Sequence, residues 1–257
     1  KAALLRVSEN GNAIAADARA GSTAPGIGGA TLASFPAFTQ LNGETLFKAR
    51  LSGVPAVTNE ALYRASDGAP RLRKGDPVSG ATITAILRFW PAGADQILAL
   101  VTLSDKSQAL ILRQADSQIL ELARTKKTMP GTGGALLSSI SAVDVNPVNG
   151  RYCLIGALQN SPASVNQALW SGNTSLGFDV PAAEQARRLP VLRLRKGEAY
   201  STPVSVLSTV RGIALQPAND IGGAGGRGLH HAIGADGSLA VTLTTAVNVS
   251  HLVMLPP

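Results

Sequence analysis

Basic side chains cluster at the ends of four predicted strands, each followed by a Gly/Pro-rich turn, and we call these places the corners. Their residue types and spacing could do chemistry. The pentapeptide Arg-Leu-Arg-Lys-Gly occurs twice unchanged, at residues 71–75 and 193–197. The candidates for a ligand-binding basic face are Arg71, Arg73, Lys74, Arg124, Lys126, Lys127, Arg193, Arg195 and Lys196, with Arg19 at the remaining corner. Such cations could hold an acidic polysaccharide or a carboxylate-rich partner by screened, additive attraction. The alternative is that they are solvated strand-end charges, which keep sheet edges from aggregating.

Two other patterns are weaker candidates for chemistry. The glycine-rich run at residues 222–228 lacks the Gly-Lys-Ser/Thr ending and the following helix of a phosphate-binding loop. His230 and His231 are adjacent, so in a strand they would point to opposite faces and could not readily share one metal ion. No Gly-x-Ser-x-Gly motif occurs. The sequence therefore predicts no catalytic residue, no metal site and no cofactor.

Composition narrows the choice of partner. The chain has 257 residues, with 23 Lys plus Arg against 16 Asp plus Glu, and the net charge of +7 favours acidic partners. Aromatic residues make up only 4% and are not interleaved with the cations, so a nucleic-acid partner is not expected. No apolar run reaches the ~18 residues that a membrane span needs. The single cysteine, Cys153, excludes an internal disulfide and is predicted to be a buried, inert thiol.

The elements that must position these residues are repeated. Residues 14–35 return as residues 119–140 with about half the positions identical. Each unit has an opening apolar strand, a second strand that ends in the basic corner, and two further apolar strands. The units cover about residues 3–60, 61–107, 108–165 and 166–257, and Asn-Gly or Asp-Gly pairs at 42–43, 149–150 and 236–237 indicate hairpins. Trp90 and Trp170 are predicted to pack in the core.

Four short antiparallel strands per unit predict an all-β chain and a single β-propeller domain over residues 1–257. Four blades are expected, with five as the alternative, because the opening strand recurs a fifth time at residues 251–254. In the expected ring, residues 4–19 pair beside the sheet formed by residues 204–254 and remove its exposed edge. The alternative is that the fifth copy begins another blade.

Residues 35–53, followed by 61–63 and 72–77, resemble the tandem N-x-x-G-x-x-x-x-A repeat of bacterial secreted and surface-anchored proteins, a domain of unknown function. The sequence departs from this motif where Gln40 replaces the leading Asn and where Asn146 and Gly150 are one residue too far apart. Residues 93–95 replace the turn of the second unit. The resemblance implies a propeller-like extracellular domain and supplies no catalytic residues.

These observations favour a noncatalytic extracellular or cell-surface module that is structural or mediates interactions, and that could be a subunit of a larger assembly. Its expected partners are another protein, further copies of itself on the cell surface, or an acidic polysaccharide. One alternative is a carbohydrate-active lyase or hydrolase that acts on an acidic polysaccharide. The other is a binder of anionic polymers through the basic corners.

Overall fold

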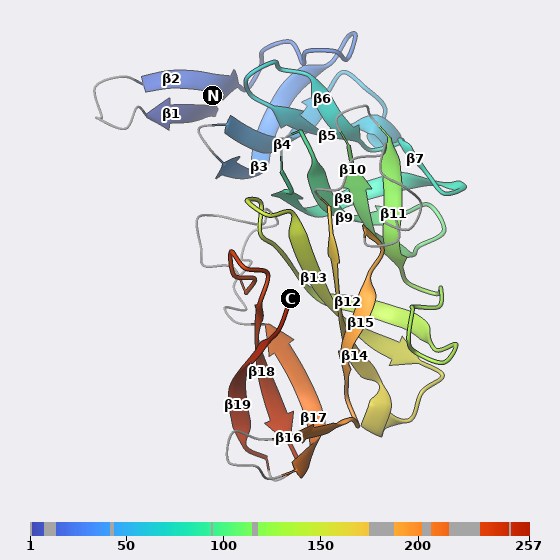
Figure 1. The fold of residues 1–257 in the computed structure, drawn as a ribbon. Helices are drawn as coiled ribbons and strands as arrows, with labels where there is room; N and C mark the ends of the chain where they lie inside the picture. The colour runs from blue at the N-terminus through green and yellow to red at the C-terminus, as the bar shows by residue number, and fades with distance from the viewer. Residues whose placement is uncertain are drawn as a thin grey trace.

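The computed structural model describes residues 2–7, 14–41, 44–93, 95–114, 118–174, 188–201, 207–215, 232–246 and 248–257. Within these residues the protein is all-β, as the sequence predicts, and its strands form antiparallel sheets that follow one another along a curved path (Figure 1). Two single 3-10 turns interrupt the strands, η1 (Ala56–Thr58) and η2 (Ala163–Val165). In the described part of the chain, no helix has the length and apolar character needed to cross a membrane.

The chain begins with a two-stranded sheet, here called the N-terminal hairpin, of β1 (Ala3–Val7) and β2 (Ile14–Arg19). Sheet 1 contains β3 (Thr31–Leu41), β4 (Glu44–Ser52), β5 (Glu60–Arg64) and β6 (Pro70–Arg73). Sheet 2 contains β7 (Pro77–Val78), β8 (Ala81–Pro91), β9 (Ile97–Leu103), β10 (Gln108–Arg113) and β11 (Ile119–Arg124). Sheet 3 contains β12 (Leu136–Val145), β13 (Arg151–Gln159), β14 (Gln167–Asn173) and β15 (Val191–Arg195). Sheet 4 contains β16 (Ala199–Ser201), β17 (Leu207–Leu215), β18 (Leu239–Thr245) and β19 (Ser250–Leu255).

Sheets 1 to 3 each combine strands from two successive sequence units, whereas the N-terminal hairpin lies within the first unit and sheet 4 within the fourth. In sheet 1, β3 and β4 are the last two strands of the first unit, whereas β5 and β6 are the first two of the second. The link between β4 and β5 contains only the η1 turn, and such a short link makes the two strands it joins antiparallel neighbours. The sequence therefore predicted the order of the strands. The predicted four-strand units, however, are offset by two strands from the sheets that form.

The predicted ring closure is not found among the described strands. β1 and β2 pair with each other and not with sheet 4, and the sheets do not form a clear four-blade ring. The reason lies in packing: Leu4 and Ala18 of the N-terminal hairpin are buried against Ala24, Leu32 and Phe47 in one apolar cluster with sheet 1. Figure 1 shows this hairpin at one end of the run of sheets and sheet 4 at the other.

Apolar clusters between consecutive sheets form the core. Successive residues of a strand point to opposite faces, so a sheet that is covered on both sides needs apolar residues at consecutive positions. In β5, Tyr63 packs toward the N-terminal hairpin while Leu62 packs toward sheet 2. Trp90 and Trp170 meet in the cluster between sheets 2 and 3, which confirms their predicted core positions. Cys153 is fully buried between sheets 3 and 4, which confirms the predicted burial of the thiol.

One hairpin geometry recurs in the N-terminal hairpin and in sheets 1 to 3. The alanine of each opening strand lies opposite the corner arginine, and the register shifts by one residue after the next pair. The four pairs are Ala3 with Arg19, Ala61 with Arg73, Ala109 with Arg124, and Ala168 with Arg195. The corner arginines predicted from the sequence therefore occupy equivalent places in successive sheets.

Candidate functional site

The corner arginines of sheets 1 and 3 bind the 3-10 turn of their own sheet. The Nε of Arg73 donates to the carbonyl oxygen of Thr58 at 3.1 Å, and that of Arg195 donates to the carbonyl oxygen of Val165 at 3.0 Å. Thr58 and Val165 are the last residues of η1 and η2, so the two contacts are equivalent. Such a turn has carbonyl groups without strand partners, and the guanidinium group supplies donors for them.

The lysine and the glycine of each corner complete this contact. The Nζ groups of Lys74 and Lys196 lie 3.4 Å from the Oδ1 atoms of Asn59 and Asn166, the residues that follow the two turns. Gly197 has a φ of 91°, and a Cβ atom there would lie 2.5 Å from the side chain of Val165. The repetition of the pentapeptide is therefore explained by its fit to the 3-10 turn. We call this set of contacts the corner staple.

The corner of sheet 2 makes an analogous set of contacts, which we include in the corner staple. Its partner is the β9–β10 turn, which carries an acidic residue and is not a 3-10 turn. Arg124 is only 7% exposed, and its guanidinium group donates to Asp105 Oδ2 at 2.8 Å, to Ser107 Oγ at 2.9 Å and to Glu121 Oε2 at 3.2 Å. The pKa of the Asp105 carboxyl lies well below its usual range, because Ser107 donates to it from the hydroxyl and the amide and Arg124 adds a further hydrogen bond.

All nine predicted site residues have a partner within the chain. Beyond the contacts given above, Arg71 pairs with Asp67, Lys126 donates to the carbonyl oxygen of Asp105, Lys127 pairs with Glu121, and Arg193 donates to the carbonyl oxygen of Pro256. The corners lie in three different sheets and do not converge on one cavity. Among the nine, Arg193 is the residue that lines the cavity described below.

A second set of contacts, which was not predicted from the sequence, joins consecutive sheets. Glu60 Oε1 accepts a hydrogen bond from the backbone nitrogen of Ile86 in sheet 2 at 2.7 Å. Gln167 repeats this contact with Ile213 of sheet 4, since its Oε1 accepts from the backbone nitrogen at 2.9 Å and its Nε2 donates to the carbonyl oxygen at 3.1 Å. The signal was present in the sequence, because Pro-Ala-x-x-Asn is followed by Glu or Gln at both 55–60 and 162–167. We call these two contacts the inter-sheet bridges.

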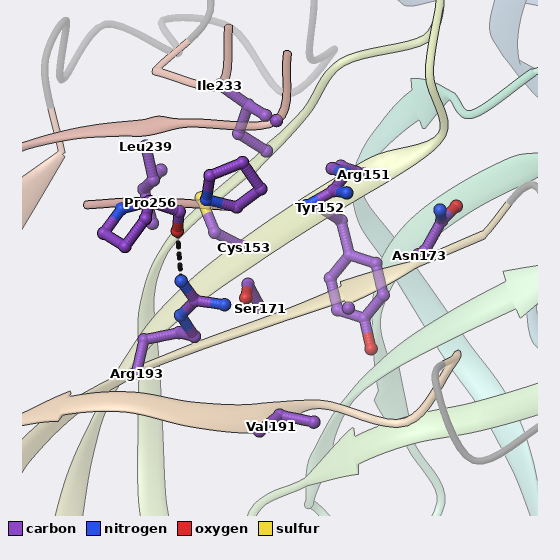
Figure 2. A pocket seen from close by; sticks show the side chains of 13 residues that line it. Arg151, Tyr152, Cys153, Ser171, Asn173, Val191, Arg193, Ile233, Leu239 and Pro256 are labelled. Atoms are coloured by element: carbon purple, nitrogen blue, oxygen red, sulfur yellow. Dashed lines mark hydrogen bonds between the residues drawn. The ribbon is translucent and has the colours of Figure 1, made fainter. Parts of the chain in front are cut away.

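A cavity of about 370 Å³ lies between sheets 3 and 4 (Figure 2). Polar side chains reach it from three strands of sheet 3: Arg151 from β13, Ser171 and Asn173 from β14, and Arg193 from β15. Apolar residues, among them Ile233, Leu239 and Pro256, form the opposite wall. Figure 2 shows Ser171 between the two arginines, with Arg193 directed at Pro256.

The two arginines give the cavity its chemical character. Arg151 lies over Gly237, where a Cβ atom would be 2.5 Å from its guanidinium carbon, and it contributes after Ser238 to a lowered pKa of the neighbouring Asp236. Guanidinium groups with a hydroxyl and an amide beside them match the oxygen atoms of a carboxylate and the hydroxyls of a sugar. Only Arg193 of this set was predicted, because the other residues are brought together by the packing of sheets 3 and 4.

Two candidates from the sequence, the glycine-rich run at residues 222–228 and the pair His230 and His231, lie outside the described residues. In the ranges that are described, no group of three or more His, Cys, Asp or Glu side chains is placed to hold a metal ion.

No protein-family model matches the sequence, and no curated protein matches it. Among solved structures, a hypothetical protein from Leishmania major has 9% sequence identity, with 93% of this chain and 91% of that chain covered and a TM-score of 0.21. A structural overlap this small carries no argument about fold or function.

Proposed function

We propose that the protein is a noncatalytic interaction module of the propeller type, presented outside the cell or on its surface. The observation that carries the proposal is the corner staple, which recurs in three sheets and uses cations that could otherwise serve a ligand. A repeated internal brace, without a matching repeated ligand site among the residues that the structure describes, is what a scaffold requires. The resemblance to bacterial surface repeats supports the extracellular location.

The propeller assignment is supported by how the sheets pack. Each antiparallel sheet of four or five strands stacks face to face on the next through a separate apolar cluster, as the blades of a propeller do. The sheets also follow a curved path rather than a straight one (Figure 1). Four blades, or five with the N-terminal hairpin as part of one, fit this arrangement.

The noncatalytic role can be tested by measuring whether the protein turns over candidate polysaccharide substrates. The full chain would be incubated with a panel of uronic-acid polysaccharides, and both reducing ends and the ultraviolet absorbance of unsaturated products would be measured. We expect no product from any substrate. Turnover that disappears in an Arg151→Gln or Arg193→Gln variant would contradict the proposal and establish the carbohydrate-active alternative.

A second candidate function is the binding of a carboxylate-bearing sugar in the cavity between sheets 3 and 4. It is favoured by the placement of Arg151, Arg193, Ser171 and Asn173 on one wall. Calorimetry with galacturonate oligomers should show binding that weakens at high salt and at least tenfold in Arg151→Gln. Arg211→Gln is the matched control, since it removes the same charge from an exposed position of β17. Equal binding by both variants would exclude the cavity as the site.

A further inference from the structure

The outward faces of the two end sheets are built like the faces that pack inside the protein. The hairpin register aligns Leu5 of the N-terminal hairpin with Tyr63, Ile111 and Trp170 of sheets 1, 2 and 3. Those three residues are fully buried, and each packs toward the preceding sheet. Leu5 is 56% exposed. Leu5 therefore presents the same packing surface as these three residues, but none of the described sheets covers it.

The other end of the protein presents the complementary half. Leu252 of β19 occupies the position equivalent to Leu62, Leu110 and Leu169 in sheets 1, 2 and 3. Those three leucines are fully buried, and each packs toward the following sheet. Leu252 is 68% exposed, and Met254 on the same face is 59% exposed. The neighbouring positions of β18 on this face are Ala240, Thr242 and Thr244, so none of the β18 and β19 positions named here is charged.

From this continuity with the internal interfaces, we propose that the sheet 4 face of one copy stacks on the N-terminal hairpin face of a second copy. The faces are Leu252 and Met254 with the outward residues of β18 on one side, and Leu5, Ile14 and Ala16 on the other. The contact repeats inside the protein three times, between sheets 1 and 2, 2 and 3, and 3 and 4. Each time, the residue equivalent to Leu62 in one sheet packs in the same cluster as the residue equivalent to Tyr63 in the next. The inference deepens the proposed interaction role and rests on it, since it names a second copy as the partner.

The contact is head-to-tail, so each copy uses two different surfaces. Such a heterologous interface produces a closed ring if the rotation closes and a filament if it does not. Contact between the two faces of a single copy is the competing arrangement, but Figure 1 shows the N-terminal hairpin and sheet 4 at opposite ends of the run of sheets.

Disulfide trapping separates these arrangements. Leu5→Cys and Leu252→Cys are made singly in the full chain, and the native Cys153 does not interfere because it is fully buried. Under oxidation, we expect each single variant alone to remain uncrosslinked and a mixture of the two to give a disulfide-linked dimer. The double variant should give a ladder that lengthens with protein concentration. A double variant that closes on itself as a monomer at every concentration, or a mixture that gives no dimer, would overturn the inference.

Sedimentation supplies a readout that does not depend on trapping. Leu252→Arg should weaken self-association at least tenfold while its thermal midpoint stays unchanged, because Leu252 is already exposed in the single copy. Val148→Arg is the control, an equally drastic change at an exposed residue away from both end faces. A wild-type chain that stays monomeric yet binds galacturonate would overturn this inference and leave the proposed interaction role intact.

Discussion

At the scale of single residues, Arg124 shows why the basic corners are better explained by stability than by recognition. A guanidinium group with four partners and almost no exposure has little capacity left for a ligand. The sequence identified the position of every corner cation. It could not show how those cations are used, because their partners are backbone carbonyls and turn residues of another strand pair.

Removal of this guanidinium group should be costly. We expect Arg124→Ala to lower the free energy of unfolding by about 3 kcal/mol, since it breaks hydrogen bonds to two carboxylates and leaves the half-buried Glu121 with one cation fewer. Arg211→Ala, at an exposed site, should change it by less than about 0.5 kcal/mol. Urea unfolding followed by circular dichroism measures both values. Equal stability of the two variants would disprove the staple in sheet 2.

Asp105 makes the same staple sensitive to acid. Its pKa is lowered in the folded state, so the unfolded chain takes up the proton more readily, and the stabilisation present at neutral pH is lost as the pH falls below about 4. We expect Asp105→Asn to be less stable than wild type at pH 7 and to lose less stability on acidification to pH 3. Thermal midpoints at the two pH values check this, and parallel losses in both proteins would contradict it.

At the scale of elements, the repeat explains more than the strand order. All-β structure, the hairpins and the core tryptophans could be predicted from alternating apolar runs and turn dipeptides. The grouping of strands into sheets could not, because the links on either side of an opening strand are both short. The cavity between sheets 3 and 4 was also out of reach, since its residues are far apart in sequence and meet only by sheet packing.

The glycine of the corner staple tests the fit between strand end and turn. Gly197→Ala should cost about 3 kcal/mol, because it combines a positive φ with a Cβ atom that overlaps Val165. Gly133 also has a positive φ but open space around its Cβ position, so Gly133→Ala should cost only about 1 kcal/mol. Urea midpoints of the two variants give the comparison. Equal losses would mean that backbone strain alone, and not the turn contact, fixes the glycine.

The inter-sheet bridges can be tested with a double-mutant cycle of Lys48 and Glu60. Glu60 in sheet 1 has Lys48 3.8 Å away, whereas Gln167 of sheet 3 has Ile155 at the position of Lys48. The charged bridge residue Glu60 is therefore paired with a cation, whereas the neutral bridge residue Gln167 has an apolar residue at the equivalent position. We expect Lys48→Ile alone to destabilise by about 2 kcal/mol and the added Glu60→Gln change to recover at least half of that loss. Simple additivity of the two losses in urea unfolding would contradict the pairing.

In the whole molecule, the described sheets stack through apolar faces, internal cations hold them, and a face stays open at each end. We expect the corner cations to stabilise this scaffold rather than bind an anionic polymer. The two roles respond differently to a change that keeps the charge but alters its geometry. Lysine preserves the positive charge of arginine, but it cannot reproduce the guanidinium fork that holds the turn carbonyl.

The most direct test is therefore the paired variant Arg73→Lys with Arg195→Lys, measured for thermal midpoint and for retention on heparin beside the paired Arg→Gln variant. We predict that the lysine and glutamine pairs both lower the midpoint by about 5 °C, because each loses the guanidinium hydrogen bonds that hold the two turns. Heparin retention of the lysine pair should equal that of wild type. A lysine pair with an unchanged midpoint, beside a glutamine pair that loses heparin retention without losing stability, would contradict the account and assign the corners to ligand binding.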